Sequence, residues 1–345
     1  MNHKENSYHQ SRRNFIKRIT ASGTIIFLSS DKLFSAIKRI DEEVAKNKIE
    51  YKFKTISVEH IKEVGRWIAK LKKDHSISEN KTYRSYIDKF VYNSAEILPN
   101  ATSLILVSIP QRISSINFHR KGKKYQILIP TGYVDDGLTY DFVKNELMKD
   151  IIKEPGKVLY EKVKLPLKTI AVRSGLAKYG RNNITYVDDY GSCHQLLGFY
   201  TDKKLEDNWG PLKMLHYCKG CTICIKNCPT KIISEEKFPI NVTKCITLYN
   251  ELADPFPDWI DPKAHNALVG CLKCQWDCPA NDEAIKRIEK LADITEEETE
   301  LILSKGENEK LWNSIIKKLE RFPSAADKEY FSRNLSLVLA NTIPE

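Results

Sequence analysis

The pattern of apolar positions predicts a mixed α/β layer in the first half of the chain. Apolar residues recur every three or four positions from residue 57 to residue 73, which indicates an amphipathic helix. The uninterrupted apolar run 104–109 ends at a proline and is typical of a buried strand. Segments 113–119 and 124–129 flank a turn that contains Gly122, as the strands of a hairpin do.

Further elements follow along the chain. Thr139 is expected to cap a helix in which Val143, Leu147 and Ile151 share one face. The next elements, in order, are a helix over 168–176, a strand over 184–187, a glycine turn at 191 and a strand over 196–200. Strands, hairpin and helices together indicate an α+β fold.

The last part of the chain is expected to be a helical cover. Helices are predicted over 282–291, 295–304, 311–319 and 333–339. Thr295 and Glu298 stand three residues apart, as in a capping box.

Composition and charge narrow the class of protein. The 345 residues include 55 Lys or Arg and 45 Asp or Glu, and 41% are hydrophobic, which excludes collagen-like, low-complexity and wholly disordered chains. The net charge of +10 is unevenly placed, because residues 280–345 carry ten basic and fourteen acidic side chains. No apolar run reaches the roughly 18 residues that would span a bilayer.

The N-terminus has the pattern of an export signal. Arg12 and Arg13 precede Phe15 and Lys17, and the uncharged stretch 19–30 follows, as in a twin-arginine leader that is read by the translocase of folded proteins. We expect a leader over 1–36 and a periplasmic location, or one at the outer face of the cytoplasmic membrane with the leader kept as an anchor. The alternative is a basic, frayed N-terminus of a cytoplasmic protein.

Eight of the nine cysteines have the spacing of iron-sulfur ligands. The run from Cys218 to Pro229 is C-x2-C-x2-C-x3-C-P, which bacterial ferredoxins use for 4Fe-4S clusters. The run from Cys271 to Pro279 repeats it with one cysteine fewer, and Cys245 can supply the missing ligand. The expected sets cross over: the first cluster takes Cys218, Cys221, Cys224 and Cys278, and the second takes Cys228, Cys245, Cys271 and Cys274.

Disulfides and zinc are the rival uses of these cysteines. An exported protein meets an oxidising compartment, but a chain of this size does not need disulfides to fold. A four-thiolate zinc site would use two C-x2-C pairs and leave the fourth cysteine of each run without a role.

Two neighbouring sequences leave their function open. The loop 179–183 is rich in Arg and Asn, so it can bind phosphate or amide groups of a cofactor, or simply be a solvated turn. Cys193 stands beside His194, so a nucleophilic or metal-binding role is one interpretation. A small buried thiol is the favoured one, because neighbouring residues of a strand point to opposite faces.

The segment from 165 to 279 resembles a known superfamily. The residues that carry the resemblance are the stretch 171–182, Gly191-Ser192, Thr201-Asp202 and the eight cysteines. They are similar to epoxyqueuosine reductases and reductive dehalogenases, which are corrinoid-dependent iron-sulfur reductases. The sequence departs from them at Ala177, at 203–205 and at Asn117-Phe118-His119, where the acidic proton donor has no counterpart.

The resemblance implies a fold and a site. It implies a mixed-sheet, nitroreductase-like domain with an inserted two-cluster ferredoxin module and a helical C-terminal tail. It also implies that cobalamin is bound by the loop residues Gly180, Arg181, Asn182, Gly191 and Ser192. Tyr179 and His194 are the candidate proton donors.

These observations lead to a set of expectations. The domains are the leader 1–36, a corrinoid-binding α/β domain 50–209, the cluster module 210–282 and the tail 283–345. The leading hypothesis is an exported reductase whose two 4Fe-4S clusters relay electrons to a corrinoid or substrate. The alternatives are a ferredoxin-like electron-transfer protein and a tRNA-modifying epoxyqueuosine-type reductase. The expected partners are an electron-donor protein, a small-molecule substrate and the translocase during export, and nucleic acid is not expected among them.

Overall fold

The computed structural model describes residues 50–135, 140–160 and 163–345. The expected leader 1–36, the connector before residue 50 and the cap at Thr139 lie outside these residues. The chain from Tyr51 to Glu345 packs as one unit. Throughout the described ranges, every helix is too short or too polar to cross a membrane.

A four-stranded antiparallel sheet forms the first layer. In spatial order its strands are β1 (Lys52–Ser57), β2 (Ser103–Pro110), β8 (His194–Thr201) and β5 (Leu159–Tyr160). All residues of β2 except Pro110 are buried, which explains its uninterrupted apolar run. The predicted strands over 104–109 and 196–200 are therefore confirmed as β2 and β8.

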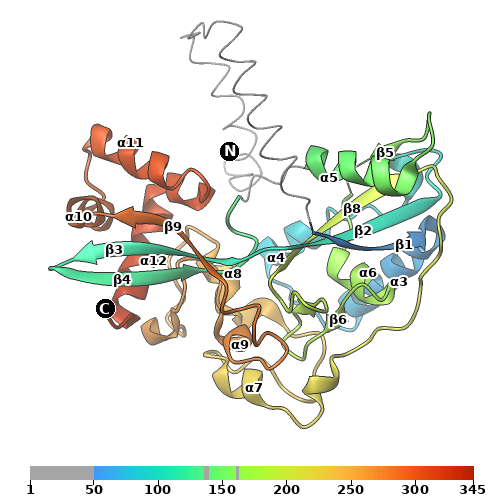
Figure 1. Ribbon diagram of the computed structural model, residues 1–345. Coiled ribbons are helices and arrows are strands. Elements are labelled where there is room, and N and C mark those ends of the chain that lie inside the picture. Colours follow the sequence, from blue (N-terminus) through green and yellow to red (C-terminus); the bar gives the residue numbers. More distant parts are fainter. Residues whose placement is uncertain (1–49, 136–139, 161–162) are drawn as a thin grey trace, which may run out of the picture. The chain divides into compact units, whose positions relative to one another are not determined.

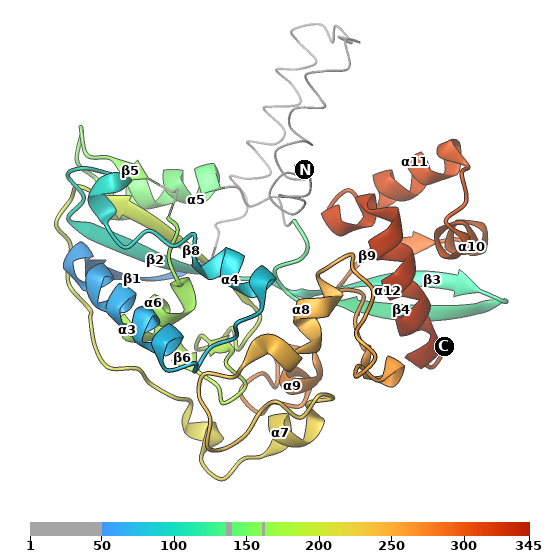
Figure 2. The same cartoon turned by 180° about the vertical axis from the view of Figure 1, so that it is seen from behind.

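Helices cover both faces of this sheet (Figures 1 and 2). On one face lie α3 (Ile61–Lys73) and α6 (Leu167–Arg173), whose buried side chains share a core with β1, β2 and β8. On the other face lies α5 (Tyr140–Leu147). Shorter elements complete the layer: η1 (Val58–His60), α4 (Lys81–Ile87), η2 (Ser94–Glu96) and the π-helical turn η3 (Met148–Ile152).

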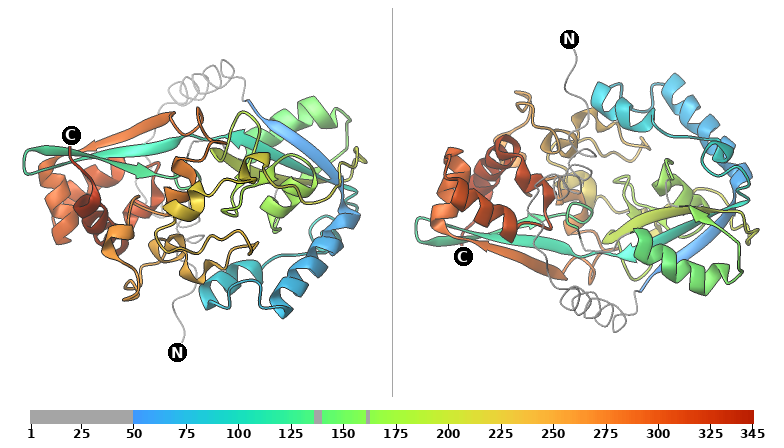
Figure 3. Two further views of the ribbon diagram at one scale, coloured as in Figure 1. Left: turned by 90° about the horizontal axis from the view of Figure 1, so that it is seen from below. Right: turned by 90° about the horizontal axis from the view of Figure 1, so that it is seen from above.

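A second sheet pairs strands that are distant in sequence. The hairpin strands β3 (Ile113–Arg120) and β4 (Lys123–Ile129) turn at Gly122, whose φ is +68°. On its other edge, β3 pairs in parallel with β9 (Ile288–Ile294), and Figure 3 shows the three strands running alongside one another.

The helix predicted over 282–291 is wrong. Residues 288–291 belong to strand β9, because Ala292 and Ile294 are buried against the open edge of β3 and its backbone groups need partners. The mixed composition of helices and sheets is otherwise as expected.

The C-terminal helices are more than a solvated cover. They are α10 (Glu296–Ser304), α11 (Glu309–Lys318) and α12 (Lys328–Asn341), with the short turn η7 (Pro323–Ala326) between the last two. Thr295 and Glu298 form the predicted capping box. Trp312, Phe331 and Leu335 are buried in one core with β3, β4 and β9.

The cluster module consists of short elements joined by irregular segments. They are η4 (His216–Cys218), α7 (Ile223–Asn227), η5 (Val242–Lys244), α8 (Ile246–Asn250), η6 (Pro262–Ala264) and α9 (Lys273–Trp276). A two-stranded ribbon, β6 (Lys178–Tyr179) and β7 (Thr185–Tyr186), frames the loop that precedes the module. Segments this irregular have little core of their own, as is typical of chains held by metal.

Candidate functional site

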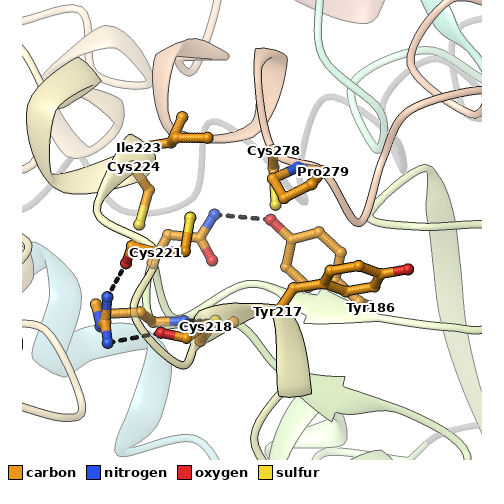
Figure 4. Close-up of a pocket in the computed structure, with 11 residues that line it drawn as sticks. Tyr186, Tyr217, Cys218, Cys221, Ile223, Cys224, Cys278 and Pro279 are labelled. Atoms are coloured by element: carbon orange, nitrogen blue, oxygen red, sulfur yellow. Dashed lines mark hydrogen bonds between the residues drawn. The ribbon is translucent and has the colours of Figure 1, made fainter.

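The first group of cysteines surrounds one pocket (Figure 4). Its members are Cys218, Cys221, Cys224 and Cys278. Three of them lie on the single loop from η4 into α7. Cys278 joins them because α7 and α9 pack against each other, as both ribbon views show.

Arg181 holds the loop that carries this group. Its backbone N–H donates to Cys218 Sγ at 3.3 Å. Its guanidinium donates to the Cys218 carbonyl at 2.8 Å and also to the Cys221 carbonyl. The same positive charge acts to lower the pKa of Cys224, although burial dominates and raises that pKa to about 11. Arg181 therefore fixes the conformation of the cysteine loop and places a positive charge beside its thiols.

The second group of cysteines lines a larger cavity of about 350 Å³, called the large cavity below. Its members are Cys228, Cys245, Cys271 and Cys274. Burial, reinforced by repulsion among the thiolates, raises the pKa of Cys245 to about 11 and that of Cys274 well above its ordinary value. Asn266 donates to Cys271 Sγ at 3.2 Å. Thiols packed in this way ionise only when a cation replaces their protons.

The chemistry of both groups fits 4Fe-4S clusters. All nine cysteines are free thiols, so no pair of them forms a disulfide. Within the described ranges, no three His, Cys, Asp or Glu side chains are placed to hold a single metal ion. Two four-cysteine groups beside one another match the ligand needs of two cubane clusters.

Asn182 connects the two groups. It is buried, it lines both pockets, and its amide donates to the Tyr186 hydroxyl at 2.8 Å and to the Cys274 carbonyl at 2.9 Å. Gly180 is required beside it, since a β-carbon there would stand 2.5 Å from Asn182 Oδ1. The loop 179–183 therefore holds the cluster module through hydrogen bonds from Arg181 and Asn182. The interpretation of this loop as a solvated turn is wrong.

Gly191 and Ser192 form a second attachment point. Asn281 Oδ1 accepts from the Ser192 N–H at 2.7 Å, and its amide donates to Ser192 Oγ at 2.9 Å. A β-carbon on Gly191, whose φ is +56°, would stand 2.5 Å from Asn281 Oδ1. This turn thus fixes the segment that follows Cys278.

The residues named as proton donors and the ninth cysteine have different surroundings. Tyr179 lines neither pocket, and burial raises the pKa of its hydroxyl, which contacts Thr169 at 3.1 Å, to about 12. His194 does line the large cavity, but burial lowers its pKa to about 4, so it is neutral near pH 7. Cys193 packs in an apolar cluster, and burial raises its pKa to about 11, in keeping with a structural thiol.

Three titratable residues of the large cavity escaped the sequence analysis. Lys168, Tyr133 and Glu251 line it together with the second cysteine group. They come from α6, from the loop after β4 and from the end of α8, so no motif links them. Local sequence carried no signal that would have singled them out.

The residues expected to bind a corrinoid do not offer it their polar groups. Arg181 donates to the carbonyls of the first cysteine group. Asn182 donates to Cys274 and Tyr186, while Ser192 is bonded to Asn281. These side chains are occupied in holding the cluster module, so the expected corrinoid contacts are not supported and no chemistry is derived from that cofactor.

Comparisons with known proteins identify the module and related chains. Residues 217–281 match the family described as the 4Fe-4S double cluster binding domain. The epoxyqueuosine reductase of Leadbetterella byssophila is 30% identical over 176 residues, which cover 51% of this chain and 53% of that protein. The chain therefore spans about half the length of the curated relatives it matches.

Solved structures share the fold. The epoxyqueuosine reductase of Streptococcus thermophilus superposes with a TM-score of 0.56 at 18% identity, covering 89% of this chain and 80% of that one. An epoxyqueuosine reductase solved with an epoxyqueuosine-modified tRNA stem loop gives a TM-score of 0.55 at 20% identity, covering 89% and 82%.

These findings correct two expectations. The leading hypothesis, an exported oxidoreductase whose clusters relay electrons to a corrinoid or substrate, is wrong as the main reading of function, since the relatives and structural neighbours are named as epoxyqueuosine reductases, which agrees with the second alternative. The expected location itself stays a prediction. The expectation that nucleic acid is not a partner is contradicted as well, because one neighbour was solved with a tRNA stem loop. The chain is a double-cluster 4Fe-4S protein that resembles the epoxyqueuosine reductases, as its cysteine spacing predicted.

Proposed function

We propose that this protein is an iron-sulfur reductase that acts on an epoxide-bearing nucleoside in transfer RNA. One observation carries the proposal: both cysteine groups are connected to the large cavity. The second group forms part of its wall, and Asn182 lines both this cavity and the pocket of the first group. The similarity to epoxyqueuosine reductases supplies the substrate class. A pure electron-transfer protein needs no such cavity, so the reductase is favoured.

We assign one cluster to each cysteine group, the first to Cys218, Cys221, Cys224 and Cys278 and the second to Cys228, Cys245, Cys271 and Cys274. When bound, the clusters supply electrons one at a time. The chain itself positions them: Arg181 fixes the first loop, and Asn182 ties it to the second group. The remaining polar residues of the large cavity are left to bind the substrate.

The surface of the cluster module supports a nucleic-acid partner. Its exposed lysines are Lys213, Lys219, Lys226, Lys231, Lys237, Lys244, Lys263 and Lys273. The module also exposes aromatic side chains, among them Tyr217 by 46% and Trp276 by 38%. Lysines bind phosphates and aromatic rings stack on unpaired bases, so residues of these kinds on the module's surface support binding of the loop of an RNA hairpin.

The architecture of the proposed enzyme follows the same comparison. We propose a nitroreductase-like sheet domain over 50–209, into which the module 210–282 is inserted before the tail 283–345. The order of the elements supports an insertion, because the chain leaves β8, passes through the module and returns as β9 to pair with β3.

The proposal is tested with the full chain, reconstituted anaerobically with iron and sulfide and reduced by dithionite. The substrate is an anticodon stem loop that carries epoxyqueuosine, and mass spectrometry of the nucleosides measures the loss of one oxygen atom. The matched controls are an unmodified stem loop and protein that was never reconstituted. Reconstituted protein that holds about eight irons per chain yet leaves the epoxide intact would return the chain to the class of electron-transfer proteins.

A second measurement tests the RNA surface separately. Replacing Lys226 and Lys231 by glutamate is expected to weaken stem-loop binding and to reduce the slope of log affinity against log salt by about one for each phosphate that is no longer bound. The control is the same double change at Lys290 and Lys305, which lie outside the cluster module. Equal binding by both double variants would exclude this face as the RNA site.

A further inference from the structure

One cation, Lys168, is found among the residues that line the large cavity. Lys168 lies in the first turn of α6, lines the cavity, and forms no hydrogen bond or ion pair with any residue that the structure describes. It is solvent-accessible, yet enough protein surrounds it for burial to lower its pKa. Lys168 is therefore an exposed lysine whose side chain forms part of the cavity wall.

A carboxyl group shares the cavity with this lysine. Glu251 follows α8 and accepts a hydrogen bond from the Tyr133 hydroxyl. Burial raises its pKa, against the opposing effects of Tyr133 and of the Lys168 charge. The helix that presents Glu251 is held rigidly, because the neighbouring Asn250 donates to the Gly270 carbonyl at 2.8 Å and contacts His265 at 3.0 Å.

Neither residue is needed to hold the cysteines. Arg181, Asn182 and Asn266 supply the contacts to the two cysteine groups, whereas Lys168 and Glu251 have no hydrogen bond to any cysteine among the described residues. The Lys168 ammonium is accessible from the cavity and has three N–H donors, so it can donate to a ligand that presents oxygen acceptors there. The large cavity is thus prepared for a ligand that presents an oxygen atom to Lys168.

We propose that Lys168 binds the epoxide oxygen of the substrate and donates a proton to it, and that Glu251 supplies the second proton. This inference rests on the proposed function. Reduction of an epoxide to an alkene breaks two C–O bonds, forms one C=C bond and releases the oxygen as water, and it consumes two electrons and two protons. The electrons come from an external low-potential one-electron donor, such as dithionite in the assay.

The charge of Lys168 suits the step in which the first C–O bond breaks. The oxygen then gains negative charge, and a preformed ammonium donor beside it stabilises that charge more strongly than water does. Lys168 gives its proton to the oxygen and becomes a neutral amine. Glu251, whose carboxyl is kept near the cavity by Tyr133, gives the second proton as water departs.

The kinetic test compares three lysine variants in the stem-loop assay. K168M is expected to lower kcat by about 10²-fold or more, since both an electrostatic donor and a proton are lost. K168R keeps the charge and is expected to retain more activity than K168M. K164M removes an exposed lysine just before α6 and is expected to match the wild type. E251Q is expected to lower kcat by at least about tenfold with KM little changed.

A second readout does not depend on turnover. Reductive methylation of the wild-type protein, followed by peptide mass spectrometry, is expected to label Lys168, and the epoxyqueuosine stem loop is expected to protect it while leaving Lys164 labelled. The cluster absorption of each variant reports whether the protein is still folded and loaded.

The outcomes separate the two proposals. A wild-type protein that turns over nothing refutes the proposed function and the role of Lys168 with it. A wild-type protein that is active, together with a loaded K168M variant of equal kcat or with Lys168 left unprotected by the stem loop, refutes only the role of Lys168.

Discussion

Replacing Arg181 by methionine tests whether this residue holds the first cluster. The change removes the two guanidinium hydrogen bonds to the carbonyls of Cys218 and Cys221 and leaves the backbone contact to Cys218 Sγ intact. The Arg181 side chain is only 16% exposed, so water cannot readily replace these bonds. Its ion pair with Glu235, at 3.6 Å, contributes little because Glu235 is exposed.

The magnitude follows from the two hydrogen bonds. Bonds to a charged group are worth about 1.5–3 kcal/mol each, so the pair contributes roughly 3–6 kcal/mol before solvent compensation. We take about 3 kcal/mol as the stabilisation of the cysteine loop that is lost in the variant. At about 1.4 kcal/mol for each factor of ten, the first cluster is expected to lose its iron roughly 10²-fold faster. The second cluster, whose cysteines Arg181 does not contact through any described hydrogen bond, is expected to keep its iron at the wild-type rate.

The assay is anaerobic iron transfer to a coloured chelator, which should become biphasic in R181M, with about half of the iron in the fast phase. K178M is the matched control, because it removes a partly exposed cation three residues away whose ion pair, among the described residues, is with Asp188. A single slow phase in R181M, identical to that of the wild type, would refute the reasoning and return Arg181 to the role of a ligand-binding residue.

Three further predictions follow from the site and the sequence. Gly191→Ala is expected to destabilise the protein by about 2–4 kcal/mol in urea unfolding, because a left-handed backbone and a β-carbon 2.5 Å from a side-chain oxygen both oppose it. Gly122 also has a positive φ, but no atom lies within 4 Å of a β-carbon built there, so Gly122→Ala should lower the free energy of unfolding by only about 1 kcal/mol. Equal destabilisation by the two substitutions would contradict the role of the close contact at Gly191. Cys245→Ser is expected to halve the iron content after reconstitution while Cys193→Ser leaves it unchanged, and full iron in the first variant would exclude Cys245 as a ligand. The twin-arginine pattern predicts that residues 1–40 carry a folded reporter out of the cytoplasm; such export would count against transfer RNA as the substrate, whereas retention would count against the signal.

Local patterns were reliable where one short segment defines the element or site. The helix over 57–73, the strand over 104–109 and the hairpin around Gly122 could be predicted, because periodicity and turn chemistry act between near neighbours. The two clusters could be predicted for the same reason, since cysteines three positions apart can wrap around one metal centre.

Patterns failed where a distant partner decided the outcome. Residues 288–291 have a sequence that suits a helix, yet they form a strand because β3 offers an open edge. Arg181 and Asn182 have the composition of a ligand-binding loop, yet their donors are used by carbonyls of the cluster module, 37 or more residues further along the chain.

The sequence by itself determined that this protein holds two 4Fe-4S clusters and resembles the epoxyqueuosine reductases, since ligand spacing is a local property of the chain. Only the tertiary structure decided which polar residues meet in the large cavity. Tyr133, Lys168 and Glu251 lie on three segments that no sequence period relates, and they share that cavity because the loop after β4, helix α6 and the end of α8 converge around the second cysteine group. Such convergence depends on long-range packing, for which local sequence carries no signal.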